Sequence, residues 1–330
     1  MKADGVIARL RLPAPGGGPQ PSALRFPDGA HFRVEIPSVE NLRVLEAVLT
    51  AAHEQELVVN RVSQGSGAML LSESELRELA ALGASAGVEV SLFVGPREGY
   101  GVGAHPRSND GAGHAAQVRG MRGLSYAVED IVRAVEAGIR SFLIADQGLL
   151  TLVCDMQAAG ELPVDCGWKI SVAMAPSNPA SLIVLERLGA TTVNIPSDMT
   201  VAELAELRAV TALPIDLYLE STDSLGGVVR GNEMADLVAV GAPLYAKFGL
   251  RNSRPLYPLG EHLVAEAIAI ARAKVARAAV ALEWMRRLDP SLVQSAPGAE
   301  GLRVPSVAAA ATLNHSPRLS SSESVASQPT

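Results

Sequence analysis

The sequence predicts an α/β fold, a (β/α)8 barrel in one domain, and three observations lead to this prediction. Eight short apolar segments recur along the chain, with helical segments between them. A glycine often ends a helical segment just before the next apolar segment, as in LERLGATTVNI, which is typical of αβ loops. The length of 330 residues exceeds an ordinary single-core domain but suits a barrel. A doubly wound sheet is the alternative, but it does not require eight evenly spaced units.

Each unit of the expected barrel begins with a short buried strand. The strands are expected at 31–37, 57–63, 89–94, 141–146, 169–175, 191–196, 214–220 and 243–249. Helices are expected between them, for example at 38–54, 72–85, 177–189 and 200–210, with a long last helix at 261–288. Ser72 and Glu75 have the spacing of a capping box, which marks the start of one helix.

The two ends of the chain differ in composition from the part between them. Residues 1–28 are rich in Pro and Gly and are expected to form a flexible arm. Residues 289–330 end in a Ser-rich stretch and are expected to form a disordered tail. The barrel is therefore expected at 29–288.

Composition restricts the partners. The formal net charge of −7 disfavours a nucleic acid or an anionic membrane as the partner, because both require a basic surface. Aromatic residues make up only 4% of the chain, which disfavours a protein that stacks on single-stranded nucleic acid. No apolar run reaches the roughly 18–20 residues of a membrane span, and the N-terminus lacks the apolar region of a signal peptide. We expect a cytoplasmic protein whose partner is a small polar or anionic molecule, with the oligomeric state left open.

Metal and cofactor chemistry is not indicated. The two cysteines, Cys154 and Cys166, are too few for a disulfide framework or for an iron–sulfur cluster with four thiolates. The six histidines show no HExxH or HxH spacing. We therefore expect no bound metal and no cofactor.

The alternation of residues in the strands places many polar side chains inside the barrel. Since alternate residues face the helices, the inward set is Arg33, Glu35, Arg61, Ser63, Glu89, Ser91, Lys169, Ser171, Asn194, Asp216, Tyr218, Glu220, Tyr245 and Lys247. Barrel interiors are normally filled by branched apolar residues. A lone buried charge is costly, so these groups must pair with one another or with a polar ligand.

Charged residues near the carboxyl ends of the strands are the candidate catalytic residues, because barrel enzymes keep their chemistry there. Lys169 and Asp216 are expected lower in the barrel. The residues expected at the upper end are Glu35, Arg61, Asp146, Glu220 and Lys247. From the seventh strand to the second, Glu220, Lys247, Glu35 and Arg61 alternate in sign. They form either a ring of ion pairs that holds the barrel closed or the lining of a pocket for a polar or anionic substrate.

The candidate catalytic residues suggest different chemistries. Glu220 or Asp146 could act as a general acid or base, and Glu35 completes the catalytic set. Lys247 could form a Schiff base, as in an aldolase or another lyase. However, two neighbouring carboxylates would raise its pKa, which suits Lys247 better to holding a carboxylate or a phosphate.

Polar groups at and just beyond the strand ends are the candidate substrate-binding residues. They are Arg61, Ser63, Gln64, Ser66, Asn194, Asp198 and Arg251. The turn at 64–67 has the sequence QGSG and could offer backbone N–H groups to an anion. The long Gly-rich connection at 97–120 is expected to form a lid or a wall of the site.

Six sequence blocks resemble a known family. RVEIPSVEN, NRVSQGSGAMLLS, SLFVGPR, NIPSD, DLYLESTDSLGGVVR and YAKFGLRN are similar to actinobacterial barrel proteins of the U32 peptidase-like family, over about residues 26–288. The resemblance implies a TIM-type barrel and a peptidase. Better understood relatives of that family act in oxygen-independent hydroxylation and bind iron–sulfur clusters through cysteines. The corresponding segment here, 216–227, contains no cysteine, so neither the cluster nor the hydroxylation is expected.

The expected function is therefore that of a metal-independent barrel enzyme, a hydrolase or a related lyase-like enzyme, acting on a small polar metabolite or peptide. One alternative is a non-catalytic barrel that binds a ligand or acts as a scaffold. Another is a Schiff-base lyase that uses Lys247.

Overall fold

Eight parallel strands close into a barrel in this protein, as a computed structural model of residues 19–174 and 176–307 shows. The strands are β1 (Phe32–Pro37), β2 (Arg61–Ser63), β3 (Glu89–Phe93), β4 (Ser141–Ile144), β5 (Gly167–Ile170), β6 (Thr192–Asn194), β7 (Ile215–Glu220) and β8 (Leu244–Phe248). They follow one another around the barrel in sequence order, and β1 pairs with both β2 and β8. The predicted TIM-type (β/α)8 barrel is confirmed.

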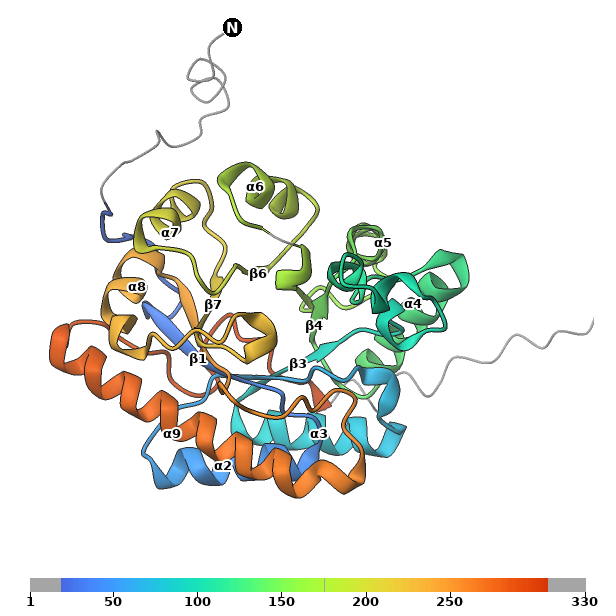
Figure 1. Cartoon of the computed structure of the whole chain (residues 1–330), viewed down its shortest axis with the longest axis horizontal. Coiled ribbons are helices and arrows are strands. Elements are labelled where there is room, and N and C mark those ends of the chain that lie inside the picture. Colours follow the sequence, from blue (N-terminus) through green and yellow to red (C-terminus); the bar gives the residue numbers. More distant parts are fainter. Residues whose placement is uncertain (1–18, 175, 308–330) are drawn as a thin grey trace, which may run out of the picture.

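Helices surround the strands on all sides (Figure 1). They are α2 (Leu42–Glu54), α3 (Glu73–Ala86), α4 (Gly120–Glu136), α5 (Gln147–Ala158), α6 (Pro179–Arg187), α7 (Val201–Arg208), α8 (Met234–Gly241) and α9 (Val264–Leu288). The long helix α9 packs along α2 (Figure 1). No helix in residues 19–174 and 176–307 is both long and apolar enough to cross a bilayer.

Side-chain caps fix where several helices begin. The predicted capping box is present in α3, where Ser72 accepts from the Glu75 N–H and the Glu75 carboxylate accepts from the Ser72 N–H. Thr200 and Glu203 form the same motif at the start of α7. Such a cap satisfies two backbone donors that the first helical turn leaves without partners.

The apolar core lies between the strands and the helices rather than inside the barrel. The outward side chains of β1, namely Phe32, Val34 and Ile36, are completely or almost completely buried against the helices. The inward positions carry the charged and polar side chains that the alternation predicts, with one exception at the end of β7.

Glu220 is this exception, and its predicted inward orientation is wrong. The pairing of β7 with β8 shifts register between Tyr218 and Glu220, so that Tyr218 lies opposite Lys247 while Glu220 lies opposite Phe248. This bulge turns Glu220 outward, where its Oε2 lies 3.3 Å from Nε of Arg277 in α9. The alternation of a regular strand does not apply beyond the bulge.

The lower end of the barrel, where the strands begin, is covered by both terminal segments. Residues 289–307 pack there instead of forming the disordered tail expected from residue 289: Gln294 bridges to Phe32, and the Ser306 N–H donates to the Gly138 carbonyl. On the other side, Phe26 from the expected flexible arm packs edge-on against Tyr245. The remaining parts of the expected arm and tail, residues 1–18 and 308–330, lie outside the described residues.

Candidate functional site

The centre of the barrel is occupied by the fully buried carboxylate of Glu35. Its Oε1 lies 2.5 Å from Nζ of Lys169 and 3.2 Å from Nζ of Lys247, and it accepts a hydrogen bond of 2.7 Å from Ser63. Its Oε2 lies 3.3 Å from Nη1 of Arg61. Glu35 is therefore surrounded by three cations, each from a different strand.

Arg61 extends this ion-pair network toward the lower end of the barrel. Its guanidinium lies 2.8 Å from Oδ1 of Asp216 and 2.7 Å from Oε1 of Glu89, and it stacks 3.5 Å from the ring centroid of Tyr245. The prediction that Arg61 lies on the upper rim is wrong, because its long side chain turns downward to reach these partners. The ring of four alternating charges is replaced by a network of three carboxylates and three cations.

The network perturbs the protonation of its members in opposite directions. Burial alone would raise the pKa of Glu35, but Lys169, Lys247 and Arg61 outweigh it and hold this pKa well below its ordinary value. Burial would lower the pKa of Lys247, but Glu35 opposes this effect and the pKa is raised. Burial lowers the pKa of Lys169 to about 7, despite the opposing effect of Glu35. Lys247 is thus the lysine that stays protonated.

A cavity of about 220 Å³, which we call the upper cavity, opens at the carboxyl ends of the strands. All eight strands or the residues directly after them contribute to its lining, which includes Ser63, Asn194, Tyr218 and Lys247. Nζ of Lys247 donates to Oδ1 of Asn194 and lies 4.4 Å from the ring centroid of Tyr218. Asn194 is itself held by a 2.6 Å hydrogen bond from Nδ2 to the Ile170 carbonyl. These contacts fix the ammonium group at the floor of the upper cavity.

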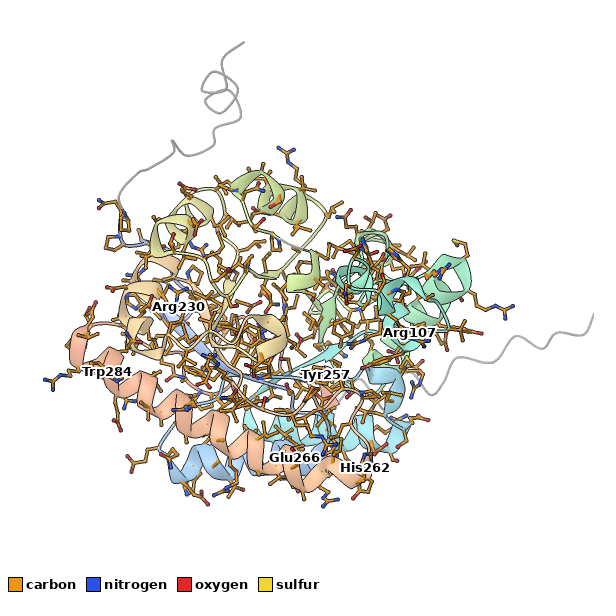
Figure 2. All side chains as sticks on the ribbon, in the orientation of Figure 1. Arg107, Arg230, Tyr257, His262, Glu266 and Trp284 are labelled. Carbon is orange, nitrogen blue, oxygen red and sulfur yellow. The ribbon has the colours of Figure 1, made fainter. Side chains whose placement is uncertain are left out.

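Arg97 and Tyr257 line the upper cavity but are not among the predicted site residues, and Tyr218 was predicted only to face inward. Arg97 stacks over the ring of Phe93 at 3.7 Å and donates to the Gly65 carbonyl. Tyr257, labelled in Figure 2, bonds to the Ser38 hydroxyl and lines the upper cavity. Its ring lies so close to Gly65 that a Cβ there would overlap it, so this position requires glycine.

The backbone N–H groups of the QGSG turn already bond to a carboxyl group of the protein itself. The N–H groups of Gly65 and Ser66 donate to the buried Glu40 at 2.9 and 2.8 Å. The Gln64 side chain bonds to the backbone N–H and carbonyl of Gly67. The expectation that this turn offers its N–H groups to a ligand is therefore wrong, although Gln64 and Gly65 still line the upper cavity.

The remaining predicted residues are separated from this cavity. Asp146 is the N-cap of α5, where it accepts from the Leu149 N–H at 2.9 Å, and it also accepts from the Val118 N–H at 3.2 Å. Ser66 is buried and accepts from the Leu259 N–H. Asp198 lies in a neighbouring cavity of about 240 Å³, and the exposed Arg251 lies 3.7 Å from Asp223.

The long connection at 97–120 contains three short 3-10 turns, at Glu98–Tyr100, His105–Arg107 and Ala112–His114. Its two arms bond to each other, through the N–H of Glu98 to the Gln117 carbonyl and the N–H of Gly99 to the Ala115 carbonyl. Arg97, at its base, is the member of this connection that lines the upper cavity.

In the part of the chain that the structure describes, no cysteine or histidine lines the upper cavity. Cys166 is buried, and burial raises the pKa of its thiol to about 12. Within residues 19–174 and 176–307, no group of three or more His, Cys, Asp or Glu side chains has an arrangement that could hold a metal ion.

Comparisons with known proteins indicate distant likeness only. No protein-family model matches the chain, and no curated protein matches it. A solved U32 peptidase is 16% identical, with a TM-score of 0.36 over 58% of this chain and 69% of that chain. A Coccidioides immitis protein provisionally named a fructose-1,6-biphosphate aldolase is 11% identical, with a TM-score of 0.45 over 79% of this chain and 91% of that one.

A third solved structure, the carboxyl transferase domain of Rhizobium etli pyruvate carboxylase, is 15% identical, with a TM-score of 0.40 over 82% of this chain and 50% of that one. These likenesses are too distant to indicate a reaction. The chain is a TIM-type barrel whose upper cavity contains a fixed lysine ammonium group.

Proposed function

We propose that this protein is a lyase-like barrel enzyme that acts on a small carboxylate-bearing metabolite in the upper cavity. The observation that carries the proposal is the ammonium group of Lys247, which Glu35 and Asn194 hold in place and which stays protonated. A fixed cation at the floor of a cavity stabilises negative charge that develops on a bound substrate. Arg97 supplies a second cation on the wall of the same cavity.

The proton donor in this proposal is Tyr218. Its ring lies against Lys247, and burial raises the pKa of its hydroxyl, so the neutral form persists at physiological pH. A neutral hydroxyl beside a cation can protonate an oxyanion or an enolate as the charge develops. Among the described residues, no Asp, Glu, His or Cys lines the upper cavity. A hydrolase therefore receives less support, because its attacking water would need a general base. A lyase that releases CO2 needs none: the C–C bond breaks, its electron pair forms an enolate beside Lys247, and the enolate takes its proton from Tyr218, which water then reprotonates.

The Schiff-base alternative is not favoured by these contacts. A Schiff base requires a neutral amine, whereas Glu35 raises the pKa of Lys247. The role assigned to Lys247 is that of an electrostatic anchor.

A binding protein without catalysis is the second candidate. It is favoured by the partners of Lys247, because an ammonium group that already has protein acceptors can hold a ligand without reacting. The two candidates differ in what the loss of the Tyr218 hydroxyl would do.

The test begins with the metabolites that copurify with the full chain, identified by mass spectrometry, followed by binding and turnover assays on the small carboxylates found. We expect Lys247→Met to weaken binding by at least tenfold. We expect Tyr218→Phe to retain binding while turnover falls by on the order of 10²-fold or more. Glu220→Gln is the matched control, because its side chain lies outside the barrel.

The outcomes separate the candidates. Binding that requires Lys247 without any turnover by the wild-type protein would establish the binding protein. Turnover that survives both Lys247→Met and Tyr218→Phe would refute the assignment of the upper cavity as the active site.

A further inference from the structure

A second cavity, of about 330 Å³, lies at the lower end of the barrel, and we call it the lower cavity. Side chains from the interior form its roof, and both terminal segments form its walls through Phe26, Gly301 and Arg303. It shares no lining residue with the upper cavity, because the ion-pair network around Glu35 lies between them. It is therefore a separate compartment.

The lining of the lower cavity is strongly cationic. Five basic side chains contribute to it, namely Arg25, Arg33, Arg61, Lys169 and Arg303, against one carboxylate, Glu89. Arg61 and Lys169 are compensated by the carboxylates of the network. The other three arginines form no ion pair with any carboxylate of residues 19–174 and 176–307.

Arg33 is the buried member of these three, at 1% exposure. Its guanidinium donates to neutral oxygens: the Ser295 hydroxyl at 3.0 Å, the Tyr245 hydroxyl at 3.1 Å and the Glu300 carbonyl at 2.5 Å. The ring of Phe26 covers it at 4.0 Å. These bonds use three of its five N–H donors. A buried cation paired only with neutral groups is costly, and a bound anion would offset that cost.

Two further guanidinium groups flank the cavity. The stem of Arg303 lies against Gly167, where a Cβ would be 2.9 Å from its Cγ, and its backbone N–H donates to Glu89. The guanidinium of Arg25 donates hydrogen bonds to the backbone carbonyls of Ser22 and Leu24. Guanidinium groups bind phosphate oxygens through paired N–H donors, and several cations around one small space suit a doubly charged anion.

We propose that the lower cavity binds the phosphate group of a small metabolite, held by Arg33 with Arg25 and Arg303. The size of the cavity excludes a macromolecule as the occupant. This site does not depend on the reaction proposed for the upper cavity, and either proposal can fail without the other.

The experiment uses the full chain and inorganic phosphate as the probe, at constant ionic strength with chloride as the balancing anion. Isothermal titration calorimetry should show saturable binding, and the melting temperature should rise with phosphate concentration. Arg303→Gln and Arg25→Gln should each weaken binding by about tenfold, the loss expected for one charge-assisted contact. Both side chains are at least partly exposed, so neither change removes a buried charge.

Two controls make the result specific. Arg286→Gln removes one positive charge from an exposed position of α9 and should leave phosphate binding unchanged. Lys247→Met tests whether the phosphate binds in the upper cavity instead, because Lys247 lines that cavity and not the lower one. The proposal is overturned by the absence of saturable binding, by an equal loss in Arg286→Gln, or by binding that depends on Lys247 and not on Arg303 and Arg25.

Discussion

The ammonium groups of Lys169 and Lys247 contact the same oxygen atom, although the two lysines face opposite ends of the barrel. Both lie against Oε1 of Glu35, at 2.5 and 3.2 Å. Lys169 contributes to the lower cavity and Lys247 to the upper cavity. One buried carboxylate thus neutralises a cation from each compartment, and the stability of the interior depends on it.

Glu35→Gln should destabilise the protein strongly. The substitution keeps the volume but leaves Arg61, Lys169 and Lys247 with one carboxylate fewer. Breaking a buried ion pair by removing one partner costs about 3–5 kcal/mol. Urea denaturation measures this loss, and Glu261→Gln is the control, because its pair with Arg43 is exposed and contributes about 0–1 kcal/mol. Equal losses in the two variants would mean that the network does not stabilise the fold.

Lys169 should make the protein more stable as the pH rises. Burial lowers its pKa from 10.5 to about 7 in the folded protein. Between these values the unfolded chain binds more protons, so the free energy of unfolding increases with pH, by at most about 1.4 kcal/mol per pH unit from this group. Urea denaturation at pH 7, 8 and 9 should show this increase in the wild-type protein and a smaller one in Lys169→Met.

Lys247→Met should move this increase to higher pH. The ammonium group of Lys247 contributes to the lowered pKa of Lys169, so its removal raises that pKa toward the value of the unfolded chain. The increase in stability just above pH 7 should therefore be smaller than in the wild-type protein. If Lys169→Met retains the wild-type slope, Lys169 is protonated throughout that range.

Glu220→Gln should have little effect on stability and none on ligand binding in the upper cavity. Its partner Arg277 is 57% exposed, and such a pair contributes about 0–1 kcal/mol. The glutamine also retains an acceptor for the Arg251 N–H, which now bonds to Oε1 of Glu220 at 3.0 Å. Denaturation and a binding assay measure the two effects. A tenfold loss of affinity would instead mean that Glu220 faces the site.

Asp146→Ala should loosen the connection at 97–120 as well as α5. Loss of an N-cap costs about 0.5–2 kcal/mol, and the Val118 N–H also loses its acceptor. Hydrogen exchange at Val118 and proteolysis within 97–120 should both become faster. Thr200→Ala removes the N-cap of α7 and is the matched control, with a similar loss of stability and no change at Val118. Equal exchange rates at Val118 in the two variants would contradict the role given to Asp146.

The fold could be predicted from the sequence because local sequence signals mark the helix and the strand of each unit of the barrel. The glycine of LERLGATTVNI ends a helix close to the start of a strand, and similar signals recur at other units. The inward positions followed from alternation as long as the strands stayed regular. The orientation of Glu220 could not be predicted in this way. The bulge after Tyr218 depends on the pairing with β8, and no sequence pattern indicates it.

The candidate site could be predicted only in part, for a different reason. Ser63, Asn194 and Lys247 lie on strands, and their positions follow from the fold. Arg97 and Tyr257 come from loops far apart in the sequence, and only the folded chain brings them to Gly65. The carboxyl group that fills the QGSG turn belongs to Glu40, which comes from another loop, so the sequence could not reveal that the N–H groups of the turn already have an acceptor.

Residues 289–307, which cover the lower end of the barrel, are synthesised long after the strand that they contact. Arg33 belongs to the first strand, and its hydroxyl acceptor Ser295 follows 262 residues later. At a translation rate of 5–20 residues per second, about 10–50 seconds separate the two on the ribosome. During that interval the β1 guanidinium must remain hydrated or find other partners. We therefore expect the lower end of the barrel to be sealed last, after α9 has been synthesised.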